Sequence, residues 1–141
     1  KMNEIQAAYG LVQLKHIDTY RNKRQLIAEK YFSHLNGIKG IRLIPKMEGV
    51  VHSYTYFPVL IDAQEYGKTR DEVYEELKRN NIFCRRYFYP LISQFPTYCE
   101  LPSASPGNLP VAVKLSEQIL CLPIFPDLQD EAIQTIVEVL K

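Results

Sequence analysis

The chain contains no tryptophan, six glycines and three cysteines among its 141 residues, and it has no long apolar run. No segment approaches the roughly 18 consecutive apolar residues that a membrane-spanning helix requires. No positively charged stretch followed by a short apolar segment, the pattern of a secretory signal, opens the sequence. The sequence therefore predicts neither a membrane span nor a secretory leader.

The chain also lacks an excess of positive or negative charge. Seventeen lysine and arginine residues stand against 16 aspartate and glutamate residues, for a formal net charge of +1. Any contact with a polyanion would therefore need a local basic cluster. Cys84, Cys99 and Cys121 are widely spaced without a Cys-x-x-Cys pair, which argues against a zinc site or a disulfide framework. We expect free thiols in a reducing compartment, the cytoplasm.

The chain does have enough apolar material for one ordinary core, since 46% of its residues are hydrophobic and 23% are charged. Its first regular pattern is a helix between Asn3 and Leu35. Asn3 and Gln6 form a capping-box sequence, and apolar residues recur at helical spacing at Ile5, Ala8, Val12, Tyr20, Ile27 and Tyr31. Unbroken, this helix would be about 48 Å long. We expect either a bend near residues 16–19 or a first half that reaches another domain or subunit.

Four short runs rich in β-branched and aromatic residues predict strands at 41–44, 53–61, 82–88 and 119–124. Thr69 and Glu72 form a second capping box and predict a helix that ends near Asn80. Asp127 is predicted to cap a last helix. The elements predict an α+β fold, with a long helical segment over residues 1–36 that links to another domain and a small domain over residues 37–141.

The many prolines between residues 90 and 110 predict a long loop of the kind that often carries function. Pro110 is predicted to occupy the first position of the helix that follows the loop.

Side chains suited to substrate binding gather at residues 85–89. Arginine and tyrosine side chains can hold a diphosphate by forked hydrogen bonds and a sugar or base by stacking, and this segment supplies Arg85, Arg86, Tyr87 and Tyr89. In a regular strand Arg85, Tyr87 and Tyr89 would share one face, with Arg86 on the other. The structural alternative is that Arg85 pairs with an acidic residue of a helix while the tyrosines cover the sheet.

His52, Ser53 and Tyr54 form a second candidate group at a strand start. No carboxylate neighbours His52 at a spacing typical of acid–base catalysis, so substrate contact is the functional role considered for this group. His16 and His34 lie on the first helix without a metal-ligand pattern, and we expect no metal site. A different class of function remains open, in which residues 85–89 form a basic and aromatic platform for single-stranded nucleic acid. The near-zero net charge and the lack of a glycine–aromatic RNA-binding motif count against it.

Four stretches of the sequence resemble, in order and rough spacing, the DegT/DnrJ/StrS family of sugar aminotransferases. They are residues 1–14 (KMNEIQAAYGLVQL), 52–57 (HSYTYF), 85–91 (RRYFYPL) and 119–124 (ILCLPI). The resemblance spans essentially the whole chain. It implies the C-terminal small domain of a fold-type I enzyme, in which a small, mostly antiparallel sheet is covered by helices.

The resemblance also implies the activity of a longer parent protein. Such an enzyme uses pyridoxal 5'-phosphate (PLP) to transfer an amino group, from glutamate, to a nucleotide-linked keto-deoxysugar for polysaccharide or secondary-metabolite synthesis, and it works as a homodimer. The family uses the segment that corresponds to residues 85–89 to approach the sugar nucleotide. Its cofactor lysine precedes a Gly-Glu-Gly-Gly run that is absent here. We therefore expect no catalytic and no cofactor-binding residue in this chain, and a large domain that precedes Lys1.

Overall fold

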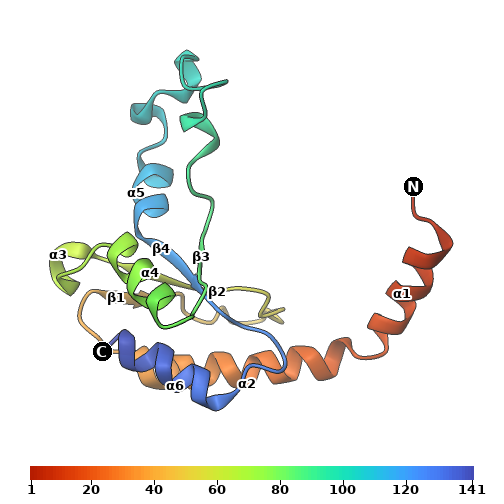
Figure 1. Cartoon of the computed structure of the whole chain (residues 1–141). Helices are drawn as coiled ribbons and strands as arrows, with labels where there is room; N and C mark the ends of the chain where they lie inside the picture. The colour runs from red at the N-terminus through yellow and green to blue at the C-terminus, as the bar shows by residue number, and fades with distance from the viewer.

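A four-stranded antiparallel sheet forms the centre of the computed structural model, which describes all residues 1–141 (Figure 1). The strands are β1 (Ile41–Leu43), β2 (Phe57–Ile61), β3 (Arg85–Arg86) and β4 (Ile119–Leu122), in the order β1-β2-β4-β3. β2 pairs with β1 and with β4, and the short β3 pairs only with β4 at the edge. The predicted α+β class with a small antiparallel sheet is confirmed.

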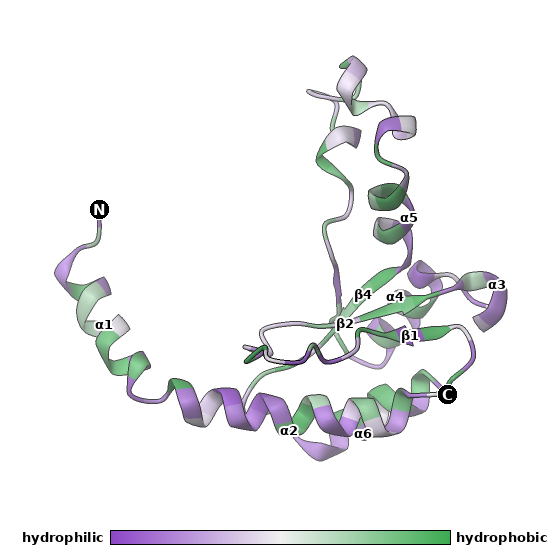
Figure 2. Cartoon of the chain, turned by 180° about the vertical axis from the view of Figure 1, so that it is seen from behind, coloured by the Kyte–Doolittle hydropathy of each residue, from purple (hydrophilic) through white to green (hydrophobic).

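Helices α2 (Ile17–Leu35), α4 (Arg70–Arg79) and α6 (Asp130–Val139) supply the buried side chains that pack on the sheet. α2 and α6 run side by side below it in both views of the chain (Figures 1 and 2). Two shorter helices, α3 (Ala63–Tyr66) and α5 (Pro110–Gln118), lie at the periphery, and Pro110 opens α5 as predicted. No helix is both long enough and apolar enough to cross a bilayer.

The first helical pattern is split into two helices. α1 (Glu4–Leu14) begins at the predicted Asn3–Gln6 capping box and ends before Lys15, and α2 starts at Ile17. The break therefore falls at the near edge of the bend predicted for residues 16–19, and Figure 1 shows α1 turned away from the body. α1 buries no residue, whereas α2 contributes Ile27, Ala28, Tyr31 and Leu35 to the core. Packing thus places α2 with the body.

All four predicted strands are shorter than expected, and β2 and β3 are shortened most. Residues 53–56 do not join β2, because the backbone amide of Tyr54 turns back to His52 and Tyr54 has a positive φ of 52°. The strand predicted at 82–88 is reduced to Arg85–Arg86. β3 lies at the edge of the sheet and pairs only with β4, through Arg85 and Arg86. The chain leaves the sheet directly after Arg86.

The chain then enters a long projection, which we call the arm and define as residues 90–118. It contains three 3₁₀ turns, Ile92–Gln94, Pro102–Ala104 and Pro106–Asn108, and returns through α5 to β4. Figure 1 shows the arm standing away from the sheet on the side opposite α2 and α6. The predicted proline-rich loop is therefore present and forms a protrusion with three 3₁₀ turns.

The predicted cap of the last helix is wrong. α6 begins at Asp130, and its N-cap residue is Gln129, which makes no capping hydrogen bond. The carboxylate of Asp127 instead pairs with Nζ of Lys23 at 3.1 Å. This ion pair joins the segment before α6 to α2, 104 residues earlier in the chain, so local sequence could not reveal it.

Candidate functional site

A cavity of about 220 Å³ brings together three of the seven predicted site residues. His52 and Ser53 lie on one side of it and Tyr87 on another. The remaining lining residues come from β2, β4 and the loop before β2: Thr55, Tyr56, Pro58, Ile119 and Cys121. Residues 30 positions and more apart in the sequence therefore form one wall.

Arg85 and Tyr87 meet at Tyr56. Nη1 of Arg85 donates a hydrogen bond to the Tyr56 hydroxyl at 3.0 Å, and the Arg85 guanidinium lies 5.7 Å from the centre of the Tyr56 ring. The rings of Tyr56 and Tyr87 are 5.2 Å apart, centre to centre. Sequence reasoning did not select Tyr56 as a site residue, although it stands in the same motif as His52, Ser53 and Tyr54. Because Tyr56 also lines the cavity, its side chain connects Arg85 and Tyr87 with His52 and Ser53.

The loop that carries His52 is fixed by two sets of hydrogen bonds. Nδ1 of His52 accepts from the backbone amide of Tyr54 at 2.8 Å, and the two rings lie 4.6 Å apart. Arg24 of α2 donates to the backbone carbonyl of Ser53 from Nε at 3.2 Å and from Nη2 at 3.0 Å. Arg24 thereby docks the loop onto α2.

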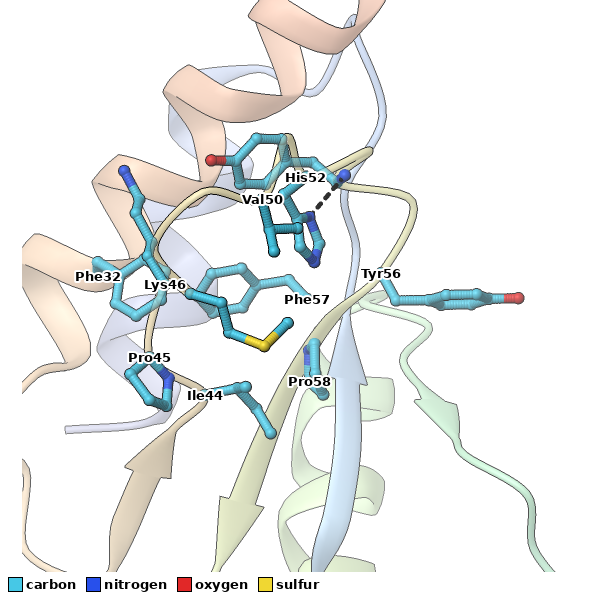
Figure 3. A pocket seen from close by; sticks show the side chains of 11 residues that line it. Phe32, Ile44, Pro45, Lys46, Val50, His52, Tyr56, Phe57 and Pro58 are labelled. Atoms are coloured by element: carbon cyan, nitrogen blue, oxygen red, sulfur yellow. Dashed lines mark hydrogen bonds between the residues drawn. The ribbon is translucent and has the colours of Figure 1, made fainter.

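A second, mostly apolar cavity of about 160 Å³ lies beside the first. Figure 3 shows the imidazole of His52 pointing into it, next to Val50 and Phe57, while the Tyr56 side chain points away. Because His52 and Tyr56 line both cavities, the two hollows share a wall. Tyr54 lines only the apolar one.

Arg86 and Tyr89 belong to a different cluster on the other side of β3. Nη1 of Arg86 donates to Oδ1 of Asp71 at 3.1 Å, and its guanidinium lies 4.7 Å from the Tyr74 ring centre. The Tyr89 ring lies 4.9 Å from this same guanidinium. The prediction that Tyr89 shares a face with Arg85 and Tyr87 is therefore wrong. Strand alternation ends at Arg86, so it does not decide the direction of Tyr89.

The two buried thiols, Cys84 and Cys121, remain protonated at neutral pH. Cys121 lies opposite Arg85 in the β3–β4 register. Burial raises the pKa of the Cys121 thiol to about 11, although the positive charge of Arg85 opposes the shift. Burial also raises the pKa of Cys84, to about 12. Because the thiolate is the nucleophile and the metal ligand, neither residue is suited to those roles at neutral pH.

The lysines do not fit the attachment of PLP. Covalent attachment requires a lysine held in a desolvated, oriented position. Every lysine of the chain is exposed, and four of them pair with carboxylates: Lys23 with Asp127, Lys30 with Asp130, Lys46 with Glu29, and Lys68 with Glu76. No group of three His, Cys, Asp or Glu side chains is arranged to hold a metal ion.

Comparisons with known proteins agree with the resemblance seen in the sequence. The chain is 48% identical over 140 residues to dTDP-4-amino-4,6-dideoxy-D-glucose transaminase of Escherichia coli, covering 99% of this chain and 38% of that protein. Among solved structures it matches a Streptococcus pneumoniae protein described as a sugar aminotransferase, in its PLP form, with a TM-score of 0.87 and 27% identity. That match covers all of this chain and 35% of the other.

A third similarity is to DesI, solved in the presence of its TDP-sugar product, with a TM-score of 0.83, 25% identity and coverage of 99% of this chain and 35% of that one. The chain thus spans little more than a third of the length of the proteins it matches. The profile of one family, described as the DegT/DnrJ/EryC1/StrS aminotransferase family, matches residues 1–141 in full. With the α+β fold and the sugar-aminotransferase relatives, this match shows that the chain belongs to the DegT/DnrJ/EryC1/StrS aminotransferase family.

Proposed function

We propose that this chain is the C-terminal small domain of a PLP-dependent aminotransferase that acts on a nucleotide-linked keto-deoxysugar. The observation that carries the proposal is the 48% identity to dTDP-4-amino-4,6-dideoxy-D-glucose transaminase over almost the whole chain. Bound PLP would supply the electron sink for amino transfer. Since no lysine here fits its attachment, the cofactor site belongs to a large domain that precedes residue 1 in the proposed parent.

The contribution of this domain is a wall for the sugar nucleotide, built from Tyr87, His52 and Ser53 around the cavity. Arg85 does not line the cavity itself but is bonded to Tyr56, which does. Arg85 uses one of its five N–H donors on Tyr56. The remaining donors can bind a diphosphate in the forked geometry that guanidinium groups favour. The ring of Tyr87 offers a flat surface for a sugar or base.

The rest of the assignment follows the family. We propose glutamate as the amino donor, a homodimer as the working assembly, and residues 1–36 as the segment that links to the large domain. The cysteines are unpaired in the structure, which supports a cytoplasmic location. The nucleic-acid alternative is not retained, because the formal net charge is only +1 and Arg86 pairs with Asp71 on the other side of β3 from Arg85, so the two arginines do not form one basic platform.

The test uses the proposed full-length enzyme. Arg85→Ala should lower kcat/KM for the nucleotide sugar by tenfold to about a hundredfold, the loss expected for about 1.5 to 3 kcal/mol of charge-assisted contact. Cofactor absorbance should stay unchanged. Arg42→Ala is the matched control, because Arg42 is an exposed strand arginine on β1 at the opposite edge of the sheet. Parental kinetics in both variants would show that Arg85 has only a structural role.

A further inference from the structure

The arm leaves and rejoins the body at one place, where the buried charged residue of the chain is found. Arg70, the first residue of α4, is 2% exposed. Its Nη1 donates to the backbone carbonyls of Ser116 at 2.9 Å and Ile119 at 3.2 Å. These carbonyls lie at the C-terminal end of α5, where backbone acceptors lack helical partners. Arg70 therefore holds the returning limb of the arm.

The outgoing limb is held by the same guanidinium. The Tyr89 ring, directly before the arm, has its centre 4.6 Å from Cζ of Arg70 and 4.9 Å from Cζ of Arg86. Both separations are within the range of cation–π attraction. One aromatic ring is thus in contact with two arginines that come from different elements, α4 and β3.

Asp71 makes this pairing of two positive charges favourable. Its Oδ1 lies 2.8 Å from Nε of Arg70 and 3.1 Å from Nη1 of Arg86. The contact with Arg70 is close but lacks the alignment of a hydrogen bond, so it is an ionic pairing. The contact with Arg86 is a hydrogen bond. One carboxylate therefore offsets the repulsion between the two guanidinium groups.

We propose that Arg70, Asp71 and Arg86 act as a pin that clasps Tyr89 and fixes the root of the arm. Arg86 and Tyr89 are then positioning residues and not substrate contacts. Because neighbouring strand residues point to opposite faces, a pin that holds Arg86 against Asp71 also directs Arg85 toward Tyr56 and the cavity. Only the identity of the ligand in that cavity depends on the proposed function; the pin itself does not.

The test compares two changes at Tyr89 in this chain, by amide hydrogen exchange without any ligand. Tyr89→Ala removes the clasped ring and should raise exchange of the α5 amides by about tenfold, while β4 amides keep their protection. Tyr89→Phe keeps the ring and should restore parental exchange, since the Tyr89 hydroxyl makes no hydrogen bond in the structure. Tyr98→Ala is the matched control: Tyr98 lies within the arm, is 45% exposed against 42% for Tyr89, and contacts no cation.

A second readout connects the pin to the cavity. Nuclear Overhauser contacts between the rings of Tyr56 and Tyr87, whose centres are 5.2 Å apart, should weaken in Tyr89→Ala and persist in Tyr89→Phe. Contacts that persist in Tyr89→Ala would remove the link between the pin and the candidate site.

Two results would overturn the proposed pin. One is α5 amide exchange in Tyr89→Ala at the parental rate, and the other is α5 amide exchange in Tyr89→Phe as fast as in Tyr89→Ala. If Tyr89→Ala also loses amide protection in β4, the substitution has disrupted the fold itself. Amide exchange in Arg86→Lys then tests the pin. This variant keeps the charge beside Asp71 but removes the planar group over the ring. About threefold faster exchange in α5 with a protected β4 supports the pin, and unchanged exchange in α5 rejects it.

Discussion

The body of the molecule and its two extensions, α1 and the arm, are built on different principles. Buried residues lie only in the body and at the root of the arm; none lies before Ile27, and none lies between Arg85 and Leu115. Figure 2 shows apolar residues in the extensions as well as in the body. Those of the extensions are exposed, as with Ile5 at 81% and Ile92 at 68%. Burial therefore stabilises the body, whereas caps, turns and one clasped ring define the extensions.

This difference can be tested first with two tyrosines in the two helices. Tyr31 of α2 is fully buried, stacks against Phe57 at 4.9 Å, and donates its hydroxyl hydrogen to the carbonyl of Pro123 at 2.9 Å. Tyr31→Ala should lower the free energy of unfolding by about 3 to 5 kcal/mol, because it leaves a cavity and an unpaired acceptor. Urea denaturation followed by circular dichroism measures the change.

Tyr9→Ala in α1 is the comparison variant. Tyr9 is 67% exposed, so the free energy of unfolding should change by less than about 0.5 kcal/mol. Equal losses in the two variants would show that α1 is part of the cooperative core, and the contrast between body and extension would fail.

Alkaline pH should act on the body through its buried thiols. Burial raises the pKa of Cys121 to about 11 and that of Cys84 to about 12, whereas unfolded thiols titrate near about 8.5. Above that pH the unfolded state releases protons that the folded state retains, so stability is full below about pH 8.5 and falls as the pH rises. The loss should be on the order of 2 kcal/mol per thiol at pH 10.

Denaturation between pH 7 and pH 10 checks this slope. Cys121→Ala should make the slope shallower. Cys99→Ala should not, because Cys99 is exposed in the arm. A slope that is unchanged in Cys121→Ala would show that the thiol is not the group responsible.

The two capping boxes provide a smaller contrast between the same regions. The Thr69 hydroxyl accepts from the amide of Glu72 at 3.2 Å, and the Asn3 side chain accepts from the amide of Gln6 at 2.8 Å. Thr69→Ala should cost about 1 kcal/mol of global stability, because α4 places Val73 and Leu77 in the core. Asn3→Ala should reduce only the helicity of α1, seen as faster amide exchange there. A global loss in Asn3→Ala, or none in Thr69→Ala, would contradict this division.

The parts of the fold that sequence predicted are those fixed by neighbours in the chain. Both capping boxes and the first position of α5 at Pro110 were predicted because the partner residues lie within one helical turn. The clasp on Tyr89 was not, because Arg70 lies 19 positions away in the chain (89 − 70) and on another element. The same holds for Arg24, which reaches Ser53 across 29 positions.

The candidate site was predicted in composition but not in arrangement. Alternation along a strand put Tyr89 with Arg85, yet β3 has only two residues and the ring turned to the opposite cluster. Strand length depends on pairing partners, which the sequence of one strand does not contain. Tyr56 was missed for a related reason, since its role depends on Arg85 and Tyr87 approaching from a different segment.

The smallest effect on folding is expected on α1, although the effect on association should be clear. Ile5, Tyr9 and Val12 are 81%, 67% and 51% exposed, and with Ala8 they form one apolar surface that the body does not cover. Apolar side chains grouped on one exposed helix favour contact with another surface. We expect the apparent mass of the chain in light scattering to rise with concentration through pairing of this surface between copies.

Val12→Glu should keep the chain monomeric, since a charge buried in such a pairing would lack a partner. Its free energy of unfolding, measured at low concentration, should match that of the parent within about 0.5 kcal/mol, because α1 buries no residue. A parent chain that stays strictly monomeric at high concentration while the amides of residues 5–12 are strongly protected would show that this surface is covered within the chain. In that case the apolar residues of α1 would serve the same purpose as those of α2, and the two helices would differ only in how deeply they are buried.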